Sequence, residues 1–390
     1  MESNLKKELD CDILICGAGL AGLSLTYRAL KSNKWLNAKI IILDNSVKRQ
    51  NDKTWSFWKK GEVPFEELIY KTWNKLSVFS NSGEKINLNS GAYSYNSINS
   101  LDFYNYVLAF LETQTNVQFL HEEVLSLDSS EQSCIAETSI STIRSNYIFN
   151  SIYEQPALKK HTQYFLQHFK GVVIKSAEIS MNTDEAFLMD FRTGQDHGTT
   201  FFYSLPISAD KLFVEYTLFS KSLLKQEDYD VAIQQYIENE LKLSEYEVLH
   251  TEFGVIPMTD HQFIRSKNRI TNFGTIGGDT RGATGYTFIN VQKTITNILE
   301  AWPVDKNLLL KEHISKKHKL YDAILLNVLD QKQYPGHKLF CDLFRNTDAK
   351  HIFKFLDAET SIIEDRHVIF SLNPFPFLKA LNTVLRNKMV

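Results

Sequence analysis

Residues 12–22, Asp12-Ile-Leu-Ile-Cys-Gly-Ala-Gly-Leu-Ala-Gly22, decide the fold of this chain. The apolar run before the glycines is typical of a buried strand, and residues 20–30 favour a helix because Gly22 is their only breaker. Residues 39–44, Lys-Ile-Ile-Ile-Leu-Asp, form a second apolar run. This order predicts a β-α-β unit with a glycine turn between its first strand and its helix.

The glycines of this turn have separate tasks in dinucleotide binding. Gly17 permits the tight turn, Gly19 lets the backbone approach a pyrophosphate, and Gly22 lets the helix pack on the sheet. The free N–H groups and the positive dipole end at the helix N-terminus attract phosphates. We therefore predict that the cofactor contacts Gly17, Ala18, Gly19, Leu20 and Gly22.

An acidic residue ends the second strand of the unit. Asp44 follows Gly22 by 22 positions, where a carboxylate accepts hydrogen bonds from the hydroxyls of an adenosine ribose. A lone Gly-x-Gly-x-x-Gly also occurs as an accidental tight turn, but here both strands, the helix and the acid are in register. The pattern predicts a dinucleotide-binding site.

A second group of glycines lies far downstream. It follows the apolar run 270–273, precedes a predicted helix over 288–299, and consists of Gly274, Gly277, Gly278, Gly282 and Gly285. A second strand–glycine–helix loop fits FAD better than NAD, because FAD is longer and needs a second grip on its flavin half. This is an analogy at the level of the fold and gives no reaction by itself.

These segments divide the chain into four parts. We assign residues 1–155 and 263–305 to an FAD-binding domain, residues 156–262 to an inserted sheet-rich substrate domain, and residues 306–390 to a helical C-terminal region. The predicted fold class is α/β, with a Rossmann-type FAD-binding fold of the glutathione-reductase-like or hydroxybenzoate-hydroxylase-like kind.

Composition excludes several classes of protein. Of the 390 residues, 43% are hydrophobic and 23% charged, which is ordinary globular usage and excludes wholesale disorder. A net charge of -3 excludes a dedicated nucleic-acid binder, which usually has a basic excess. The four scattered cysteines have no zinc-site spacing and fit a reducing compartment. Since residues 1–10 also lack the apolar run of a signal peptide, we expect a cytoplasmic protein without a metal.

Several further stretches together resemble one family. They are Asn51-Asp-Lys-Thr-Trp-Ser-Phe-Trp58, Gln167-His-Phe-Lys-Gly171, Met189-Asp-Phe191, Phe213-Val-Glu-Tyr-Thr217, Ala283-Thr-Gly-Tyr286, Phe355-Leu-Asp-Ala-Glu-Thr360 and Pro376-Phe-Leu-Lys-Ala-Leu381. With the N-terminal glycine turn, they are similar to the lycopene cyclase family of flavoproteins. The matching stretches run from residue 10 to about residue 385, which is nearly the whole chain.

The resemblance implies a lycopene β-cyclase-like reaction, an isomerisation by an intramolecular lyase without net redox change. A proton adds to the terminal alkene of an acyclic ψ-end, a nearby double bond attacks the carbocation, the β-ionone ring closes and a proton is lost. The implied partners are lycopene or another acyclic carotenoid, FAD in its reduced form, and NADPH as reductant. The alternatives are an FAD/NADPH-dependent monooxygenase or polyene reductase on the same fold, and a non-catalytic flavin protein at a membrane.

Two carboxylates are the catalytic candidates. Glu215 lies in an apolar, alternating strand pattern, where burial raises a carboxyl pKa and keeps the acid neutral for protonating an alkene. The alternative for Glu215 is a solvated position on an edge strand. Asp190 is a candidate proton donor, orienter or base, or else forms a structural ion pair with Arg192 or Arg281.

The resemblance also implies contacts around the flavin. In the wider superfamily the last FAD strand is followed by Gly-Asp, and here either Gly274-Thr275 or Gly278-Asp279 takes that place. Aromatic residues near the flavin stabilise a carbocation by about 0.5–2 kcal/mol each, or simply pack; the candidates are Trp55, Phe57, Trp58, Tyr286 and Phe288. The predicted cofactor contacts of this half are Trp55, Val124, Gly278, Asp279, Gly285 and Tyr286.

A carotenoid is dissolved in a membrane, so its enzyme needs a route to lipid. One helix face near the C-terminus is apolar and consists of Phe377, Leu378, Leu381, Val384 and Leu385. A basic run precedes it, made of Lys306, Lys311, Lys316, Lys317 and Lys319, which is either a solvated helix face or a contact for anionic headgroups. We expect peripheral contact between the C-terminal region and a membrane.

Overall fold

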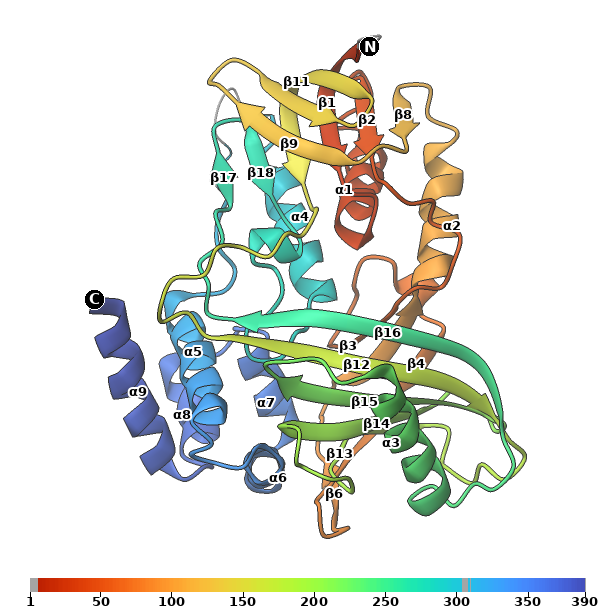
Figure 1. Ribbon diagram of the computed structural model, residues 1–390, viewed down its shortest axis with the longest axis vertical. Coiled ribbons are helices and arrows are strands. Elements are labelled where there is room, and N and C mark those ends of the chain that lie inside the picture. Colours follow the sequence, from red (N-terminus) through yellow and green to blue (C-terminus); the bar gives the residue numbers. More distant parts are fainter. Residues whose placement is uncertain (1–5, 304–307, 309, 390) are drawn as a thin grey trace.

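Two large β-sheets and the helices around them make up the described residues of this computed structural model, which are 6–303, 308 and 310–389 (Figure 1). The first sheet lies at the top of that view and contains the N-terminal strand. The second sheet lies below it, and the C-terminal helices gather beside the second sheet.

The first sheet has five parallel strands at its centre, in the order β18, β11, β1, β2, β8. Their bounds are β1 (Lys7–Cys16), β2 (Ile40–Leu43), β8 (Val117–Leu120), β11 (Ser141–Asn150) and β18 (Ile270–Asn272). The apolar runs of β1 and β2 are buried throughout, as expected for parallel strands covered on both faces. The predicted β-α-β unit is therefore present.

Helices cover one face of the first sheet and an antiparallel pair of strands covers the other. The helices are α1 (Leu20–Lys31), α2 (Ser100–Leu111) and α4 (Phe288–Ala301), and the strands are β9 (Val124–Ser129) and β10 (Cys134–Thr138). A short strand, β17 (Ser266–Lys267), extends the edge at β18. Because β1, β11 and β18 are parallel, the segments that follow them meet at one edge of the sheet, and two of these segments are the predicted glycine loops.

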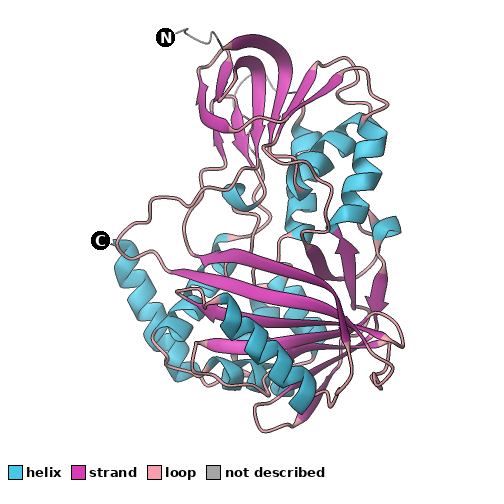
Figure 2. Ribbon diagram, turned by 45° about the vertical axis from the view of Figure 1, so that its right-hand side comes forward, coloured by secondary structure: helices cyan, strands magenta, loops and turns pink. Residues whose placement is uncertain are grey.

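The second sheet has seven strands in the order β16, β12, β15, β14, β13, β5, β6. It forms the lower part of the molecule in Figure 2. Only the β5–β13 pair is parallel. The bounds are β5 (Lys75–Phe79), β6 (Lys85–Leu88), β12 (Tyr164–Lys175), β13 (Glu185–Asp190), β14 (Thr199–Pro206), β15 (Lys211–Ser220) and β16 (Glu247–Thr259). Strands β5 and β6 come from the range that we assigned to the FAD-binding domain, yet they complete the second sheet.

The two faces of the second sheet have different surroundings. Val172, Val214 and Leu218 belong to the face on which α3 (Gln226–Asn239) packs. Phe213 and Glu215, which have the opposite parity, point to the other face, where Phe213 packs in one cluster with Trp58, Tyr95 and Phe353. A small third sheet of β3 (Thr54–Lys59), β7 (Ser94–Asn99) and β4 (Lys71–Trp73) lies in the N-terminal part of the chain, with 3-10 turns at Glu66–Leu68 and Thr275–Gly277 elsewhere.

The C-terminal region is helical, as predicted. It comprises α5 (Lys316–Asp330), α6 (Gly336–Asn346), α7 (Ala349–Leu356), α8 (Ile362–Ile369) and α9 (Pro374–Met389). The apolar face predicted on α9 is only partly exposed: Val384 is 3% exposed and Phe377 packs against Tyr334, whereas Leu378 and Leu385 face solvent. Lys306 of the predicted basic run lies outside the described residues.

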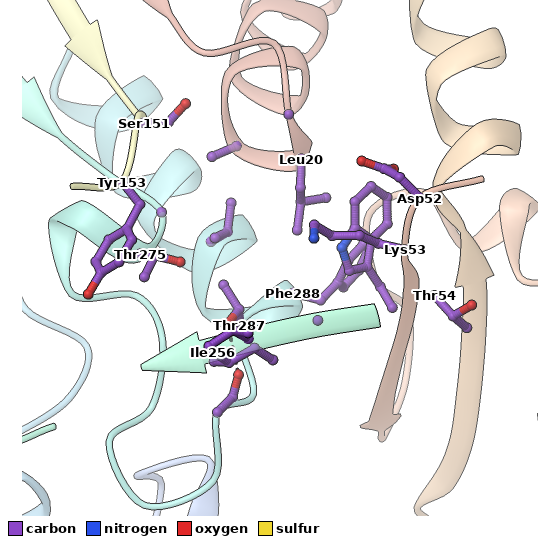
Figure 3. Close-up of a pocket in the computed structure, with 18 of the residues that line it drawn as sticks. Leu20, Asp52, Lys53, Thr54, Ser151, Tyr153, Ile256, Thr275, Thr287 and Phe288 are labelled. Carbon is purple, nitrogen blue, oxygen red and sulfur yellow. Dashed lines mark hydrogen bonds between the residues drawn. The ribbon is translucent and has the colours of Figure 1, made fainter. Parts of the chain in front are cut away.

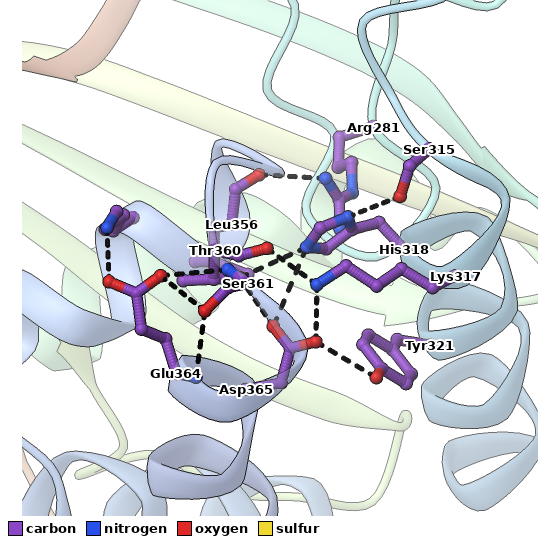
Figure 4. Close-up of polar contacts among 11 residues, drawn as sticks. Arg281, Ser315, Lys317, His318, Tyr321, Leu356, Thr360, Ser361, Glu364 and Asp365 are labelled. Carbon is purple, nitrogen blue, oxygen red and sulfur yellow. Dashed lines mark hydrogen bonds and ion pairs between the residues drawn. The ribbon is translucent and has the colours of Figure 1, made fainter.

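A buried polar network fastens these helices to the second glycine loop (Figure 4). Arg281 is 2% exposed; its Nε donates to Asp322 Oδ2 on α5 at 2.7 Å, and its Nη1 donates to the carbonyl oxygen of Leu356 at 3.0 Å. Lys317 of α5 donates to Asp365 of α8 at 2.6 Å and is therefore not free to bind lipid headgroups. In the part of the chain that the structure describes, no helix is both long and apolar enough to span a bilayer.

Replacement of Gly22 by Ala should destabilise the fold. A Cβ atom at residue 22 would lie 1.9 Å from the carbonyl oxygen of Gly17, although Ala ordinarily stabilises a helix interior by about 0.5–1 kcal/mol relative to Gly. We expect Gly22→Ala to lower the free energy of unfolding by at least about 2 kcal/mol in a denaturant titration.

Gly19→Ala is the matched control, because a Cβ atom at residue 19 has no heavy atom within 4 Å. This variant should stay within about 1 kcal/mol of the wild type, the range of a helix N-cap change. Equal unfolding free energies for the two variants would contradict the close contact between Gly17 and Gly22.

Candidate functional site

A cavity of about 600 Å³ lies between the loop edge of the first sheet and the second sheet (Figure 3). Leu20 at the start of α1, Thr275 of the second glycine loop and Ile256 of β16 face it from three sides. The lining includes Asp44, which follows β2 of the first sheet, and Glu215 on β15 of the second sheet. One continuous space therefore joins the predicted ribose contact to the predicted acid.

The first glycine turn forms one end of the cavity. Gly17 has a φ of +98°, which favours glycine, and its N–H donates to the carbonyl oxygen of Leu43 at 2.8 Å. Gly17, Gly19 and Leu20 line the space, and Gly19 is the residue before α1. The open space beside Gly19, next to the N-terminus of a helix, fits a pyrophosphate.

Asp44 extends this end of the cavity. Burial raises its pKa, but hydrogen bonds from Ser46 and from the backbone N–H of Ala18, together with Lys48, lower the pKa on balance below the ordinary value. Ala18 N–H donates to Asp44 Oδ2 at 2.7 Å, and Lys48 Nζ lies 3.2 Å from Oδ1. A carboxylate at this place suits the hydroxyls of a ribose.

The second glycine loop forms the middle of the cavity wall. Gly274, Thr275, Gly285 and Tyr286 line it, and the N-terminus of α4 follows at Phe288. Gly285 has a φ of +71°, and a Cβ atom there would lie 2.3 Å from Oε1 of Gln167. Two helix N-termini thus face one elongated space, as the two halves of FAD require.

Gln167 of β12 supports this fit. It is 7% exposed and lines the cavity, and its Oε1 is buried without a hydrogen-bond partner. A buried polar atom that lacks a partner costs about 1–3 kcal/mol, so a ligand with a polar edge is expected to satisfy it. The cradle beside Gly19, the carboxylate of Asp44 and the amide of Gln167 together fit FAD.

Gly278 and Asp279, predicted to contact the flavin half, do not line the cavity; Gly274 and Thr275 do. Asp279 is fully buried beneath the loop, where its Oδ2 accepts from the N–H of Gly274 at 2.6 Å and its Oδ1 lies 2.8 Å from Nη1 of Arg265. Asp279 therefore points into the protein and stabilises the loop, and does not face the cavity. The positive φ angles of Gly274 and Gly278 turn the chain back on itself and place the carboxylate there.

The remaining predicted cofactor residues divide into two groups. Trp55, Val124 and Tyr286 line the cavity. Ala18 and Gly22 do not: Ala18 acts through its backbone N–H on Asp44, and Gly22 closes the turn against Gly17. Of the candidate aromatic wall, Phe57 and Trp58 also lie outside the lining, and Phe57 stacks on Phe288 with ring centroids 4.4 Å apart.

Glu215 lies at the other end of the cavity. It is 9% exposed on β15, and Thr217 Oγ1 donates to its Oε1 at 2.6 Å. Burial raises its pKa to about 8, with a smaller contribution from the charge of Glu252 and an opposing one from Thr217. Glu215 is therefore mostly protonated at pH 7, which is the state predicted for a proton donor.

Three tyrosines surround this acid. Tyr203 is directly opposite Glu215 on β14, and its hydroxyl lies 3.5 Å from that of Tyr286, which in turn lies 3.1 Å from that of Tyr95. Burial raises the pKa of all three well above 10, so the phenols are neutral. Glu215 thus faces an aromatic, uncharged part of the cavity.

Asp190, the second catalytic candidate, does not line the cavity. It is fully buried, accepts from Arg192 Nε at 2.9 Å, and accepts from the hydroxyl of Tyr236 at 2.6 Å. Asp190 therefore forms the structural ion pair with Arg192 that was predicted as the alternative to a catalytic role.

Glu252 of β16 is a buried carboxyl group that the sequence reasoning missed. It is 5% exposed, and Thr54 Oγ1 donates to its Oε2 at 2.7 Å. Burial raises its pKa to about 7, against the hydrogen bond from Thr54 and the charge of Lys53. The available signal was the alternation around Glu252 and Gly254, which places the carboxylate on a half-buried strand.

This arrangement can deliver a proton to an apolar molecule. A neutral acid, aromatic faces and little water favour protonation of a carbon–carbon double bond, since the resulting cation meets rings instead of a nucleophile. The other end of the same cavity suits a dinucleotide, so the acid and a bound flavin ring would lie along one space.

Comparison with protein families gives a match over nearly the whole chain. A family model described as lycopene cyclase protein matches residues 12–382. No curated protein matches the chain.

Several solved structures share the fold. The flavin-dependent brominase Bmp2 aligns with a TM-score of 0.60 and 13% identity over 97% of this chain and 100% of the other. A geranylgeranyl bacteriochlorophyll reductase-like protein from Thermoplasma acidophilum gives 0.55 and 12% over 96% of each chain. A variant of halogenase PltM in complex with FAD gives 0.55 and 9% over 88% and 78%. These likenesses confirm the predicted Rossmann-type FAD-binding fold.

The pH dependence of stability tests the burial of Glu215. Folding raises its pKa from 4.5 to about 8, so the stability it contributes is full below pH 4.5 and is lost as the pH rises through 8. Between pH 4.5 and pH 8 the unfolding free energy of the wild type should therefore fall by a few kcal/mol relative to that of Glu215→Gln, whose side chain stays neutral. Each unit by which folding raises the pKa corresponds to roughly 1.4 kcal/mol.

Urea titrations at several pH values between these limits measure this difference. Glu247→Gln, an exposed position on β16, is the control and should run parallel to the wild type. Parallel curves for Glu215→Gln and the wild type would contradict a raised pKa at Glu215.

Proposed function

The chain belongs to the lycopene cyclase family, and we propose that it closes β-ionone rings at the ψ-ends of lycopene or another acyclic carotenoid, with no net redox change. The observation that carries this proposal is Glu215, a neutral, buried acid that faces a cavity among three tyrosines. An enzyme of this class is an intramolecular lyase.

The proposed reaction starts at Glu215. Its carboxylic proton adds to the terminal alkene carbon of the ψ-end and leaves a tertiary carbocation on the neighbouring carbon. A double bond further along the polyene attacks that carbon, the six-membered ring closes, and the ring loses a proton to a base. One proton enters and one leaves, so the product is an isomer of the substrate.

The aromatic residues around Glu215 support the cation. Tyr95, Tyr203 and Tyr286 are neutral phenols, since burial moves their pKa values still further above 10, so their ring faces and hydroxyl dipoles are available to a positive charge. Each face is worth about 0.5–2 kcal/mol. Since about 1.4 kcal/mol is tenfold in rate, three such faces together matter to the barrier.

We propose FAD as the cofactor, in its reduced form and with NADPH as the reductant. Gly17, Gly19 and Asp44 would hold the adenosine diphosphate half, and Gln167 and Gly285 would border the flavin half. When bound, reduced FAD would supply an electron-rich ring beside the developing cation. The chain's part is to hold that ring, exclude water and present the proton at Glu215.

We also propose peripheral contact with a membrane through α8 and α9. Exposed apolar side chains gather there, with Phe375 at 76%, Ile363 at 74% and Phe370 at 70%, accompanied by Ile362, Ile369, Leu378 and Leu385. The exposed cations Arg366 and Lys379 lie on the same two helices and suit anionic headgroups. The proposed membrane surface keeps Leu378 and Leu385 of the apolar face predicted from the sequence. It includes exposed residues of α8 in place of Phe377 and Val384, which point into the protein.

Glu215→Gln should abolish most of the activity. The amide keeps the size of the side chain but has no acidic proton, and general acid catalysis is typically worth about 10²–10⁴-fold. We expect a loss near the upper end of that range, because an unactivated alkene is not protonated by water. The measurement is ring-product analysis with lycopene under anaerobic conditions, with FAD reduced by dithionite and flavin content as the folding control.

Asp190→Asn is the parallel variant, and it should lower stability more than turnover per folded enzyme, because it leaves Arg192 without its buried partner. Near-wild-type ring formation by Glu215→Gln would rule out its role as the acid. Consumption of NADPH in proportion to product would instead favour a monooxygenase or a reductase.

The membrane contact is tested with Phe370→Ser combined with Phe375→Ser. Full burial of a Phe side chain is worth about 1.5–3 kcal/mol, so losing two should weaken cosedimentation with anionic liposomes at least about tenfold. Val231→Ser, at an apolar position on α3 that is 53% exposed, is the control and should sediment like the wild type. Equal sedimentation of all three proteins would refute this surface.

A further inference from the structure

Glu252 and Glu215 lie on the same face of the second sheet. Gly171 of β12 is directly opposite Glu215 of β15 on one side and directly opposite Glu252 of β16 on the other. Directly opposite residues of antiparallel strands point to the same face. The two carboxyl groups therefore flank a glycine, with their backbones two strand spacings, roughly 10 Å, apart.

An aromatic ring fills the space above that glycine. A Cβ atom at residue 171 would lie 2.6 Å from Cζ of Phe213 and 3.3 Å from Cγ of Glu252. Phe213 itself is 3% exposed. Charges interact strongly across such a gap, because little water is present to weaken the Coulomb interaction.

The surroundings place the negative charge on Glu252. Its carboxylate accepts from Thr54 Oγ1, and Lys53 lies near enough to lower its pKa. Burial raises the pKa of both acids, to about 7 for Glu252 and about 8 for Glu215, and the charge of Glu252 adds to the shift of Glu215. Lys53 stabilises the charged form of Glu252, whereas the groups that act on Glu215 are Glu252 and Thr217 and include no cation, so the negative charge is better stabilised at Glu252.

Other titratable groups face the pair, and one of them, Asp52, opposes a negative charge on Glu252. Those facing Glu215 are the neutral phenols of β7, β14 and the second glycine loop, namely Tyr95, Tyr203 and Tyr286. Those facing Glu252 come from the segments before β3 and β4, namely Asp52, Lys53 and Tyr70.

We propose that Glu252 is a positioning residue for the proton donor: its carboxylate form, favoured by the hydrogen bond from Thr54, helps to keep Glu215 protonated between turnovers. The inference rests on the proposed role of Glu215 as the acid. When Glu215 gives its proton to the substrate, two carboxylates face each other across Gly171. Their repulsion favours return of the proton that ring closure releases, so Glu215 is restored and the protons balance without an oxidant or a reductant.

The test follows the Glu215 carboxyl group by difference infrared spectroscopy on the purified full-length protein. The C=O stretch of the protonated acid is assigned by its absence in Glu215→Gln. In the wild type this band should titrate away with a midpoint of about pH 8. In Glu252→Gln the midpoint should fall by about 1 pH unit, which raises the ratio of charged to neutral Glu215 about tenfold at a given pH.

Three further variants sharpen the test. Thr54→Val removes the hydrogen bond that favours the charged form of Glu252, so the midpoint of Glu215 should fall in the same direction by a smaller amount. Glu252→Asp should restore part of the wild-type value. Glu247→Gln, exposed on the same strand, should leave the midpoint unchanged. The alkaline limb of the cyclisation rate should move with the infrared midpoint in each variant.

The possible outcomes separate this inference from the proposed function. An unchanged midpoint in folded Glu252→Gln and Thr54→Val would overturn the role of Glu252, while lost activity in Glu215→Gln would still support the acid. A shifted midpoint in a protein that forms no rings would sustain the carboxyl pair and overturn the cyclase proposal. If Glu252→Gln does not fold, Thr54→Val decides.

Discussion

The buried ion pair between Arg281 and Asp322 is the constraint on which the geometry of the site depends. The guanidinium joins α5 and the end of α7, while the backbone of Arg281 accepts from the N–H of Gly285 at 2.8 Å and donates to the carbonyl oxygen of Tyr286 at 3.1 Å. Removing one partner of a buried pair typically costs about 3–5 kcal/mol, because the other charge is left without compensation. The C-terminal helices therefore hold the loop that presents Tyr286 to the cavity, although they contribute no lining themselves.

Exclusion of water is what gives the cavity its chemical character. A carboxylic acid that is neutral at pH 7 is an ordinary consequence of burial, and here the sheet face, the tyrosines and the ring of Phe213 supply that burial around Glu215. The same burial weakens the fold at alkaline pH, where Glu215 and Glu252 would both have to ionise. The burial of Glu215 and Glu252 on one face of the second sheet therefore sets both the pKa of the acid and the pH dependence of fold stability.

Features that depend on local sequence pattern could be predicted from the sequence. Features that depend on contacts between distant segments could not. The β-α-β unit with Gly17 and Asp44 was predictable because the apolar runs, the glycine spacing and the acid follow one another within 33 residues, 12–44. The burial of Glu215 was predictable from the alternating apolar pattern around it, while its catalytic role stays a prediction. The inward turn of Asp279 was not, since it depends on how two left-handed glycines fold the loop. Glu252 was missed because its burial depends on the register of β16 against β12, two strands separated by more than 70 residues.

The mixed origin of the two sheets has a consequence for how the chain folds during synthesis. The second sheet takes β5 and β6 from residues 75–88 and its other strands from residues 164–259, and the first sheet stays open until β18 emerges at residue 272. Neither sheet can be completed by an N-terminal fragment, so strand edges remain unpaired for about two thirds of translation. Nascent chains with exposed edges are prone to aggregate.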